Sequence, residues 1–134
     1  MLMQKVLFNS LGDPAYTARL SWPPTVNHYH QPIISKGKPR IIKSAKVREY
    51  LEKNYMLVHR QQIGDLMIND NVIMQINLHP PTLRSYDVDN RAKAVLDTLS
   101  KASFWIDDDQ CESLLLNKCQ KEKGGFVDIF IWNC

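Results

Sequence analysis

Residues 70–79 read DNVIMQINLH, and the chain then passes through two prolines into YDVDNRAK at residues 86–93. In the first stretch apolar side chains occupy alternate positions, which is the pattern of a half-buried β-strand. The prolines end this strand because they cannot donate to its backbone hydrogen bonds. The sequence therefore predicts a strand that leads directly into an acidic segment, so that a sheet would aim the carboxylates.

Two aspartates of this segment, Asp87 and Asp89, would point the same way if the backbone is still extended at Asp87, since alternate residues of a strand share a face. Beyond them the apolar residues between 92 and 99 recur at helical spacing, with Lys93 and Asp97 on the opposite side. Lys93 then lies one turn from Asp89, close enough to approach an anion held by cations at the two carboxylates. Carboxylates and a lysine would surround one phosphate.

A site for hydrolysis of a phosphodiester needs a third carboxylate, because Mg²⁺ prefers a few carboxylate oxygens and two such ions about 4 Å apart favour the reaction. The run Asp107-Asp108-Asp109 can supply this carboxylate from the turn after the helix, and the pattern leaves open which of the three does so. Each acidic element alone is also ordinary for a solvated loop or a helix cap. Their combination with Lys93 favours a functional site, while Asn90 fits either a helix start or an orienter of a ligand.

The order of these elements resembles the RusA-type Holliday junction resolvases of phages and prophages, which carry D-x-D-N-x-x-K, L-D-x-L and W-x-D-D-x-Q. The matching residues here are 87–93, 96–99 and 105–110, and an upstream Asn-x-Tyr lies at 27–29. The likeness covers most of the chain except its first dozen residues. One departure is that residues 84–86, Arg-Ser-Tyr, stand where family members often carry several arginines.

The resemblance implies a small homodimeric α/β (α+β) endonuclease that uses Mg²⁺, or Mn²⁺ in its place, to make paired symmetric nicks in four-way DNA junctions during recombination and repair. Carried over by position, Asp87, Asp89 and Asp108 would be metal ligands and Lys93 the catalytic lysine. A protein of this phage or prophage type would act on branched DNA in the cytoplasm of a bacterial host.

Length and composition fit one domain, residues 1–134, with 1–13 as a peripheral extension that contains a short strand candidate at residues 6–8. The hydrophobic fraction of 44% and charged fraction of 23% are ordinary, and no apolar run approaches the roughly 20 residues that span a bilayer. We therefore expect a cytoplasmic protein without a membrane partner. Three widely spaced cysteines and four histidines without H-x-x-x-H spacing support neither a disulfide framework nor a zinc site.

The net charge of +3 is mild, but its distribution is uneven, because residues 36–48 contain six basic side chains and no acidic one. We expect this basic segment to contact DNA phosphates, although a solvated hairpin and helix start would have a similar composition. Tyr86 would stack on an unpaired base near the crossover or, equally, pack in the core. The candidate DNA-binding residues are Lys36, Lys38, Arg40, Lys43, Lys46, Arg84, Tyr86 and Arg91.

The remaining pattern predicts a mixed sheet of about four to six strands covered by two main helices. The first expected elements are a strand over 15–21 and a basic hairpin over 27–42 that turns at 35–38. A helix follows from Ser44 to about Gln62, with Gly64 past its end, and a second helix follows Asp89. The last elements are strands over 113–121 and 126–132, joined by a hairpin connection at 122–125.

Two other functions remain open on the sequence. The first is a non-catalytic DNA-binding module whose aspartates bind a structural cation or cap a helix. The second is a metal-dependent enzyme that uses the same carboxylates on a small phosphate or diphosphate substrate, although the basic hairpin favours a polymer.

Overall fold

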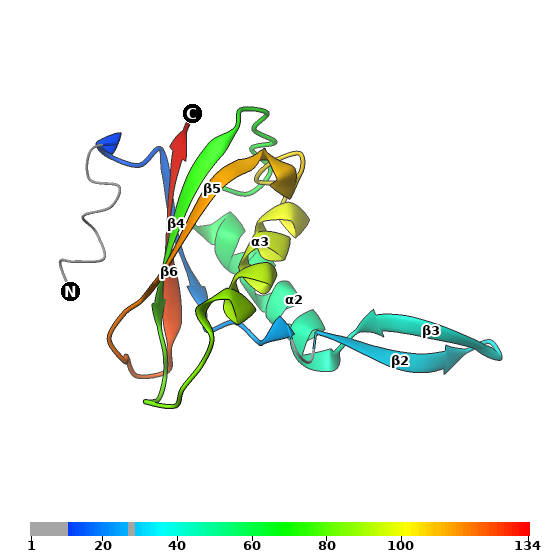
Figure 1. The fold of residues 1–134 in the computed structure, drawn as a ribbon. Helices are drawn as coiled ribbons and strands as arrows, with labels where there is room; N and C mark the ends of the chain where they lie inside the picture. Colours follow the sequence, from blue (N-terminus) through cyan, green and yellow to red (C-terminus); the bar gives the residue numbers. More distant parts are fainter. Residues whose placement is uncertain (1–10, 27–28) are drawn as a thin grey trace.

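The computed structural model describes residues 11–26 and 29–134 and shows an α+β domain with six described strands and two main helices (Figure 1). The strand candidate at residues 6–8 lies outside the described residues. No described helix is long and apolar enough to cross a membrane. The elements are β1 (Tyr16–Ser21), β2 (His30–Ser35), β3 (Lys38–Lys43), α2 (Ala45–Arg60), β4 (Val72–His79), the 3₁₀ turn η3 (Val88–Arg91), α3 (Ala92–Lys101), the 3₁₀ turn η4 (Asp108–Gln110), β5 (Cys111–Lys118) and β6 (Phe126–Asn133).

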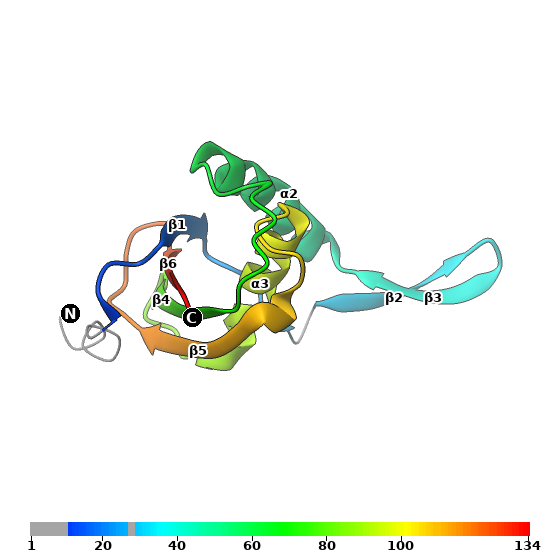
Figure 2. The same ribbon diagram turned by 90° about the horizontal axis from the view of Figure 1, so that it is seen from above.

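Four strands form a mixed sheet in the order β1, β6, β4, β5, and both helices lie on one face of it (Figure 2). The expected hairpin between the last two strands is wrong. Strand β5 pairs in parallel with β4, with Met74 opposite Leu114, whereas β6 runs antiparallel between β4 and β1. Strand β4 is buried at most of its positions and therefore takes a central place, which separates β5 from β6. Helix α3 provides the crossover that a parallel pair requires.

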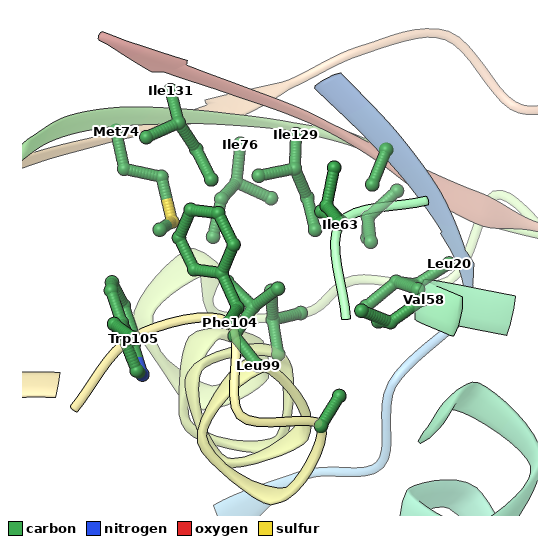
Figure 3. Close-up of a cluster of buried hydrophobic side chains, with 14 of the residues drawn as sticks. Leu20, Val58, Ile63, Met74, Ile76, Leu99, Phe104, Trp105, Ile129 and Ile131 are labelled. Carbon is green, nitrogen blue, oxygen red and sulfur yellow. The ribbon is translucent and has the colours of Figure 1, made fainter. Parts of the chain in front are cut away.

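The main core lies between the sheet and the helices. Met74 and Ile76 of β4 and Ile129 of β6 face Leu99 of α3 and Phe104 from the turn after it (Figure 3). All five are fully buried, so the alternation of β4 predicted its inner face correctly. This packing fixes α3 against β4 and thereby fixes the direction in which the start of α3 points.

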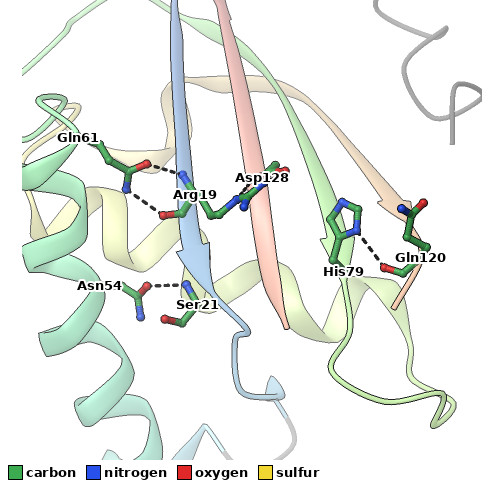
Figure 4. A network of polar contacts seen from close by, with 7 residues as sticks. All are labelled: Arg19, Ser21, Asn54, Gln61, His79, Gln120 and Asp128. Carbon is green, nitrogen blue, oxygen red and sulfur yellow. Dashed lines mark hydrogen bonds and ion pairs between the residues drawn. The ribbon is translucent and has the colours of Figure 1, made fainter. Parts of the chain in front are cut away.

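Helix α2 and Gln61, the residue that follows it, cover the outer edge of β1, where polar side chains bond the backbone groups that no strand pairs (Figure 4). Gln61 accepts from the backbone N–H of Arg19 at 2.7 Å and donates to its carbonyl at 2.9 Å. Asn54 accepts from the N–H of Ser21 at 2.8 Å, and the Tyr50 hydroxyl donates to the Ser21 carbonyl at 2.8 Å. The helix thus satisfies a sheet edge that would otherwise offer a template for pairing.

The ends of α2 agree with the sequence. Ser44 caps its start by accepting a backbone N–H, and its last residue is Arg60. The left-handed residue after the helix is Gln62, with φ of 67°. Gly64 is needed for a different reason: a Cβ there would lie 2.3 Å from the Nδ1 atom of His59.

Strands β2 and β3 form a two-stranded hairpin that projects from the body (Figure 1); we call residues 30–43 the arm. Its turn is Lys36-Gly37, where both residues have positive φ, which suits a two-residue hairpin loop. The backbone N–H of Ser44 donates to the carbonyl of Tyr29 at 2.8 Å and closes the base of the arm. The predicted basic hairpin is confirmed over the described residues.

Candidate metal and DNA site

The acidic segment forms η3 and the start of α3, beyond the end of β4. Asp87 has an extended backbone and precedes η3 without capping it through its side chain, and the Asn90 side-chain amide lies 3.4 Å from its Oδ2 atom. Asp89 lies inside the 3₁₀ turn, so the two aspartates do not share the face of a strand as the sequence suggested. Both side chains are exposed. Their oxygens are therefore accessible to a cation or to solvent.

The run of three aspartates forms η4, where the three residues differ in what they bond. Asp107 caps the turn: its carboxylate accepts from the N–H of Asp108 at 2.7 Å, and its own N–H donates to the Gln110 side chain at 2.8 Å. Burial, then a hydrogen bond with Asp107 and the charges of Asp107 and Asp97, raise the pKa of Asp108, whereas the charge of Lys93 lowers this pKa. Asp108 thus lies within the electrostatic reach of α3.

Lys93 belongs to a three-residue cluster on α3 and the base of the arm. Its Nζ atom lies 3.7 Å from Oδ2 of Asp97 and 5.1 Å from the ring centre of Tyr29. The Tyr29 hydroxyl donates to the same Asp97 oxygen. Asp97 thus pairs with Lys93, whereas Lys101 pairs with Glu52.

Tyr29 is the residue at this site that sequence reasoning missed. It is only 2% exposed and packs in a small cluster with residues of α2 and α3. Burial and the hydrogen bond with Asp97 raise its pKa, so the hydroxyl stays protonated and remains a donor. The Asn-x-Tyr pattern marked the position, but a partner 68 residues away could not be read from the chain.

The carboxylates fit a divalent cation by their chemistry, because hard oxygen ligands suit Mg²⁺. Asp87, Asp89 and Asp108 are all exposed, and η4 contacts α3 while η3 runs directly into it. In their present rotamers, however, no three histidine, cysteine or acidic side chains of the described residues lie close enough together to hold one ion. The described residues thus do not form a complete ligand set for one ion in this structure.

Two candidate DNA-binding residues beside the acidic segment are partly buried. Tyr86 packs edge-on against Trp22, with ring centres 5.2 Å apart, and the hydroxyl of Tyr86 is buried with no hydrogen-bond partner among residues 11–26 and 29–134. Arg91 donates to the Pro23 carbonyl and lies 5.1 Å from the Trp22 ring centre. Burial raises the pKa of Tyr86 and lowers the pKa of Arg91. The structure thus shows the packed alternative for Tyr86, and Arg84 beside it is exposed.

The other candidate DNA-binding residues lie on the arm and the first turn of α2. All five are exposed, which leaves their charges free for an external anion: Lys36, Lys38, Arg40, Lys43 and Lys46. Arg84, Tyr86 and Arg91 line one pocket of about 320 Å³.

An α+β domain with exposed carboxylates around a helix start, a lysine one turn on and a basic arm has the features of a nuclease. The comparisons with known proteins identify the family. The family model described as Endodeoxyribonuclease RusA matches residues 22–131, and the chain belongs to this family. It is similar to proteins named crossover junction endodeoxyribonuclease RusA from Shigella sonnei (33% identity), Escherichia coli K12 (32%) and Enterobacteria phage 82 (33%). Each match covers 87% of this chain and 92% of the relative.

Proposed function

We propose that this protein is a crossover junction endodeoxyribonuclease that resolves four-way DNA junctions by hydrolysing phosphodiester bonds. The supporting observation is that residues 22–131, which the family model matches, contain Asp87, Asp89, Lys93 and Asp108, arranged around the start of α3 and η4. The relatives that share about a third of their residues with this chain carry that activity in their names.

Asp87, Asp89 and Asp108 would hold the divalent cation, with Mg²⁺ the expected ion and Mn²⁺ a substitute. Such a cation neutralises charge that develops on the phosphate and acidifies water, which makes hydrolysis feasible near neutral pH. The protein residues keep their oxygens exposed at this position, and Asn90 helps to orient Asp87 through the 3.4 Å contact. Asp107, in contrast, serves as the cap of η4.

Lys93 would stabilise the charge of the attacked phosphate or donate a proton to the leaving oxygen. Its ammonium is about half exposed, so it can reach a bound phosphate from the helix surface. Asp97 would orient Lys93 through their ion pair, and the Tyr29 hydroxyl would fix Asp97 by a hydrogen bond.

DNA would lie across the basic surface of the arm and the start of α2, where exposed lysines and Arg40 contact phosphates without reading bases. Arg84, Tyr86 and Arg91, which line one pocket and are close to the carboxylates in the sequence, would add further DNA contacts. The reaction would take place in the bacterial cytoplasm, where the DNA is.

Two strands of a four-way junction must be cut, and one chain with a single carboxylate site attacks one phosphate at a time. We therefore propose a two-fold homodimer with one site in each subunit, which would make symmetric nicks.

The decisive experiment is incubation of the protein with a labelled four-way junction, with and without Mg²⁺, followed by mapping of nicks on all four strands. Paired nicks at symmetric positions that require the ion are expected. Junction binding without nicks in Mg²⁺ or Mn²⁺ would instead support the non-catalytic DNA-binding module. That alternative also fits the observation that the described residues do not form a complete ligand set for one ion. Hydrolysis of a nucleotide without any nicking would support the small-phosphate enzyme.

A further inference from the structure

One face of the arm carries four apolar side chains next to one another. In the register of β2 with β3, Pro32 lies opposite Ile41 and Ile34 lies opposite Pro39. Residues directly opposite each other, and residues two positions apart, share a face of a two-stranded ribbon. These four side chains therefore form one continuous apolar face, which we call the apolar face of the arm.

This apolar face is open to solvent. Ile34 is 79% exposed and Ile41 is 76% exposed, and both prolines are exposed as well. Isoleucine side chains that are this exposed contribute little to the stability of the fold, because an apolar side chain stabilises a protein only when it is buried. A contiguous exposed apolar surface commonly marks a binding site.

The charge of the arm favours nucleic acid as the partner. Lys36, Lys38, Arg40 and Lys43 are all exposed on the same ribbon, and residues 30–43 contain no acidic side chain. A second arm of the same chain would repel this one, whereas the DNA backbone attracts it.

The prolines also disfavour pairing of the arm with another strand. In a hydrogen-bonded antiparallel pair both residues exchange N–H bonds, which a proline cannot do. The Pro32–Ile41 and Ile34–Pro39 pairs are therefore non-hydrogen-bonded pairs. In such a pair the backbone N–H and C=O groups point away from the partner strand. Each outer edge of the ribbon thus lacks an N–H where an added strand would need one.

The position of the arm connects it to the candidate site. Tyr29, at its base, bonds Asp97 and lies under Lys93, so the arm starts beside the lysine. Its six-residue strands reach about 20 Å, which is the length of about six base pairs. With a phosphate at Lys93, the arm would lie over the DNA that flanks the cut.

We infer that the apolar face of the arm inserts against unstacked bases at the branch point of junction DNA, while the basic side chains hold the adjacent phosphates. This inference rests on the proposed function. Proteins that kink or open DNA commonly insert isoleucine or proline wedges between base steps, and a two-stranded ribbon is narrow enough to enter a groove. The bases at a branch point are the most readily unstacked in such a substrate, so the apolar face would favour junction over duplex.

The test uses a four-way junction with 2-aminopurine at the crossover, whose fluorescence rises when the base unstacks, in Ca²⁺ to avoid cleavage. Ile34→Thr with Ile41→Thr keeps β-branched side chains but makes the face more polar. Ile34→Leu with Ile41→Leu keeps the face apolar, and Met56→Gln removes an exposed apolar side chain from α2 as a matched control.

Wild type, the leucine pair and Met56→Gln should raise the fluorescence. The threonine pair should lose most of that rise and bind the junction about tenfold more weakly, with duplex affinity unchanged. Equal fluorescence and junction affinity in the threonine pair and wild type would overturn the inference. So would a lower oligomeric state of the threonine pair in sedimentation, because the face would then be covered by a second copy. If wild type itself neither binds nor nicks the junction, the proposed function has failed, and this outcome is visible without any arm variant.

Discussion

At the scale of single residues, the candidate metal ligands are exposed carboxylates that differ in the neighbours they bond. The sequence predicted Asp87, Asp89 and the Asp107–Asp109 run, but spacing could not tell three adjacent aspartates apart. The structure distinguishes them by bonding, since Asp107 caps η4 whereas Asp108 interacts with the charges of α3. A cap is a local feature that depends on backbone angles, and such angles are not readable from three identical side chains.

This difference predicts the order of effects in a series of Asp→Asn variants. Asp108→Asn should lose at least a hundredfold in nicking rate, as expected for loss of a charged ligand, while Asp109→Asn, an equally exposed neighbour, should nick like wild type. Asp107→Asn should lower stability by less than about 1 kcal/mol, since asparagine is itself a good cap. Junction nicking under single-turnover conditions and thermal unfolding measure the two effects. A slower Asp109→Asn than Asp108→Asn would move the ligand to the other residue.

The Tyr29 hydroxyl gives a second prediction at this scale. Tyr29→Phe keeps the buried ring and removes only the donor to Asp97, which should cost about 1 kcal/mol of stability and leave Lys93 less fixed. We expect the rate of the chemical step to fall about tenfold while junction affinity stays unchanged. Tyr55→Phe is the matched control, because Lys101 lies over that ring but away from the acidic segment. An unchanged rate in Tyr29→Phe, or an equal loss in Tyr55→Phe, would show that the hydroxyl has only a structural role.

At the scale of elements, the sequence predicted most strands and helices but not the partners of β5 and β6. Periodicity reports which face of a strand is buried, and it identified β4 and the apolar side of α3 correctly. The glycines at 124–125 do adopt positive φ, yet the strands on either side of them do not pair with each other. Strand order depends on which strand most needs burial on both faces, and this is a property of the whole sheet rather than of one turn.

Because α2 covers the edge of β1, substitutions at two adjacent residues of α2 should change the free energy of unfolding by different amounts. Asn54 is fully buried and bonds the Ser21 N–H and the Tyr50 carbonyl, so Asn54→Ala takes the side-chain partner from the half-buried Ser21 N–H. The free energy of unfolding should fall by about 1–3 kcal/mol. Lys53→Ala, the exposed neighbour on the same helix, should change it by less than about 0.5 kcal/mol. Urea denaturation measures both, and equal values would show that the side chain does not support the β1 edge.

At the scale of the whole molecule, charge is separated into an acidic segment and a basic arm. Replacing Lys36, Lys38 and Arg40 together with glutamine should weaken binding to junction and duplex alike. The slope of log affinity against log salt should become shallower by about 0.9 for each phosphate that the variant no longer neutralises. Binding titrations at several salt concentrations measure this slope. An unchanged slope would show that the arm does not contact phosphates, and Lys53→Gln on α2 controls for the removal of a lysine elsewhere.

The proposed dimer gives the last prediction, because paired cutting requires two sites on one substrate. In a two-fold dimer, mixing wild type with an excess of Asp87→Asn protein places most wild-type subunits in mixed dimers, in which one subunit can cut. A supercoiled plasmid that extrudes a cruciform is then linearised by wild type but only nicked by the mixture. The variant changes an exposed side chain, so it should fold and exchange subunits normally, and circular dichroism with sedimentation of each pure protein checks this. If the protein sediments as a monomer at micromolar concentration even with junction bound, and linear plasmid still forms, two monomers must cut independently and the dimer is excluded.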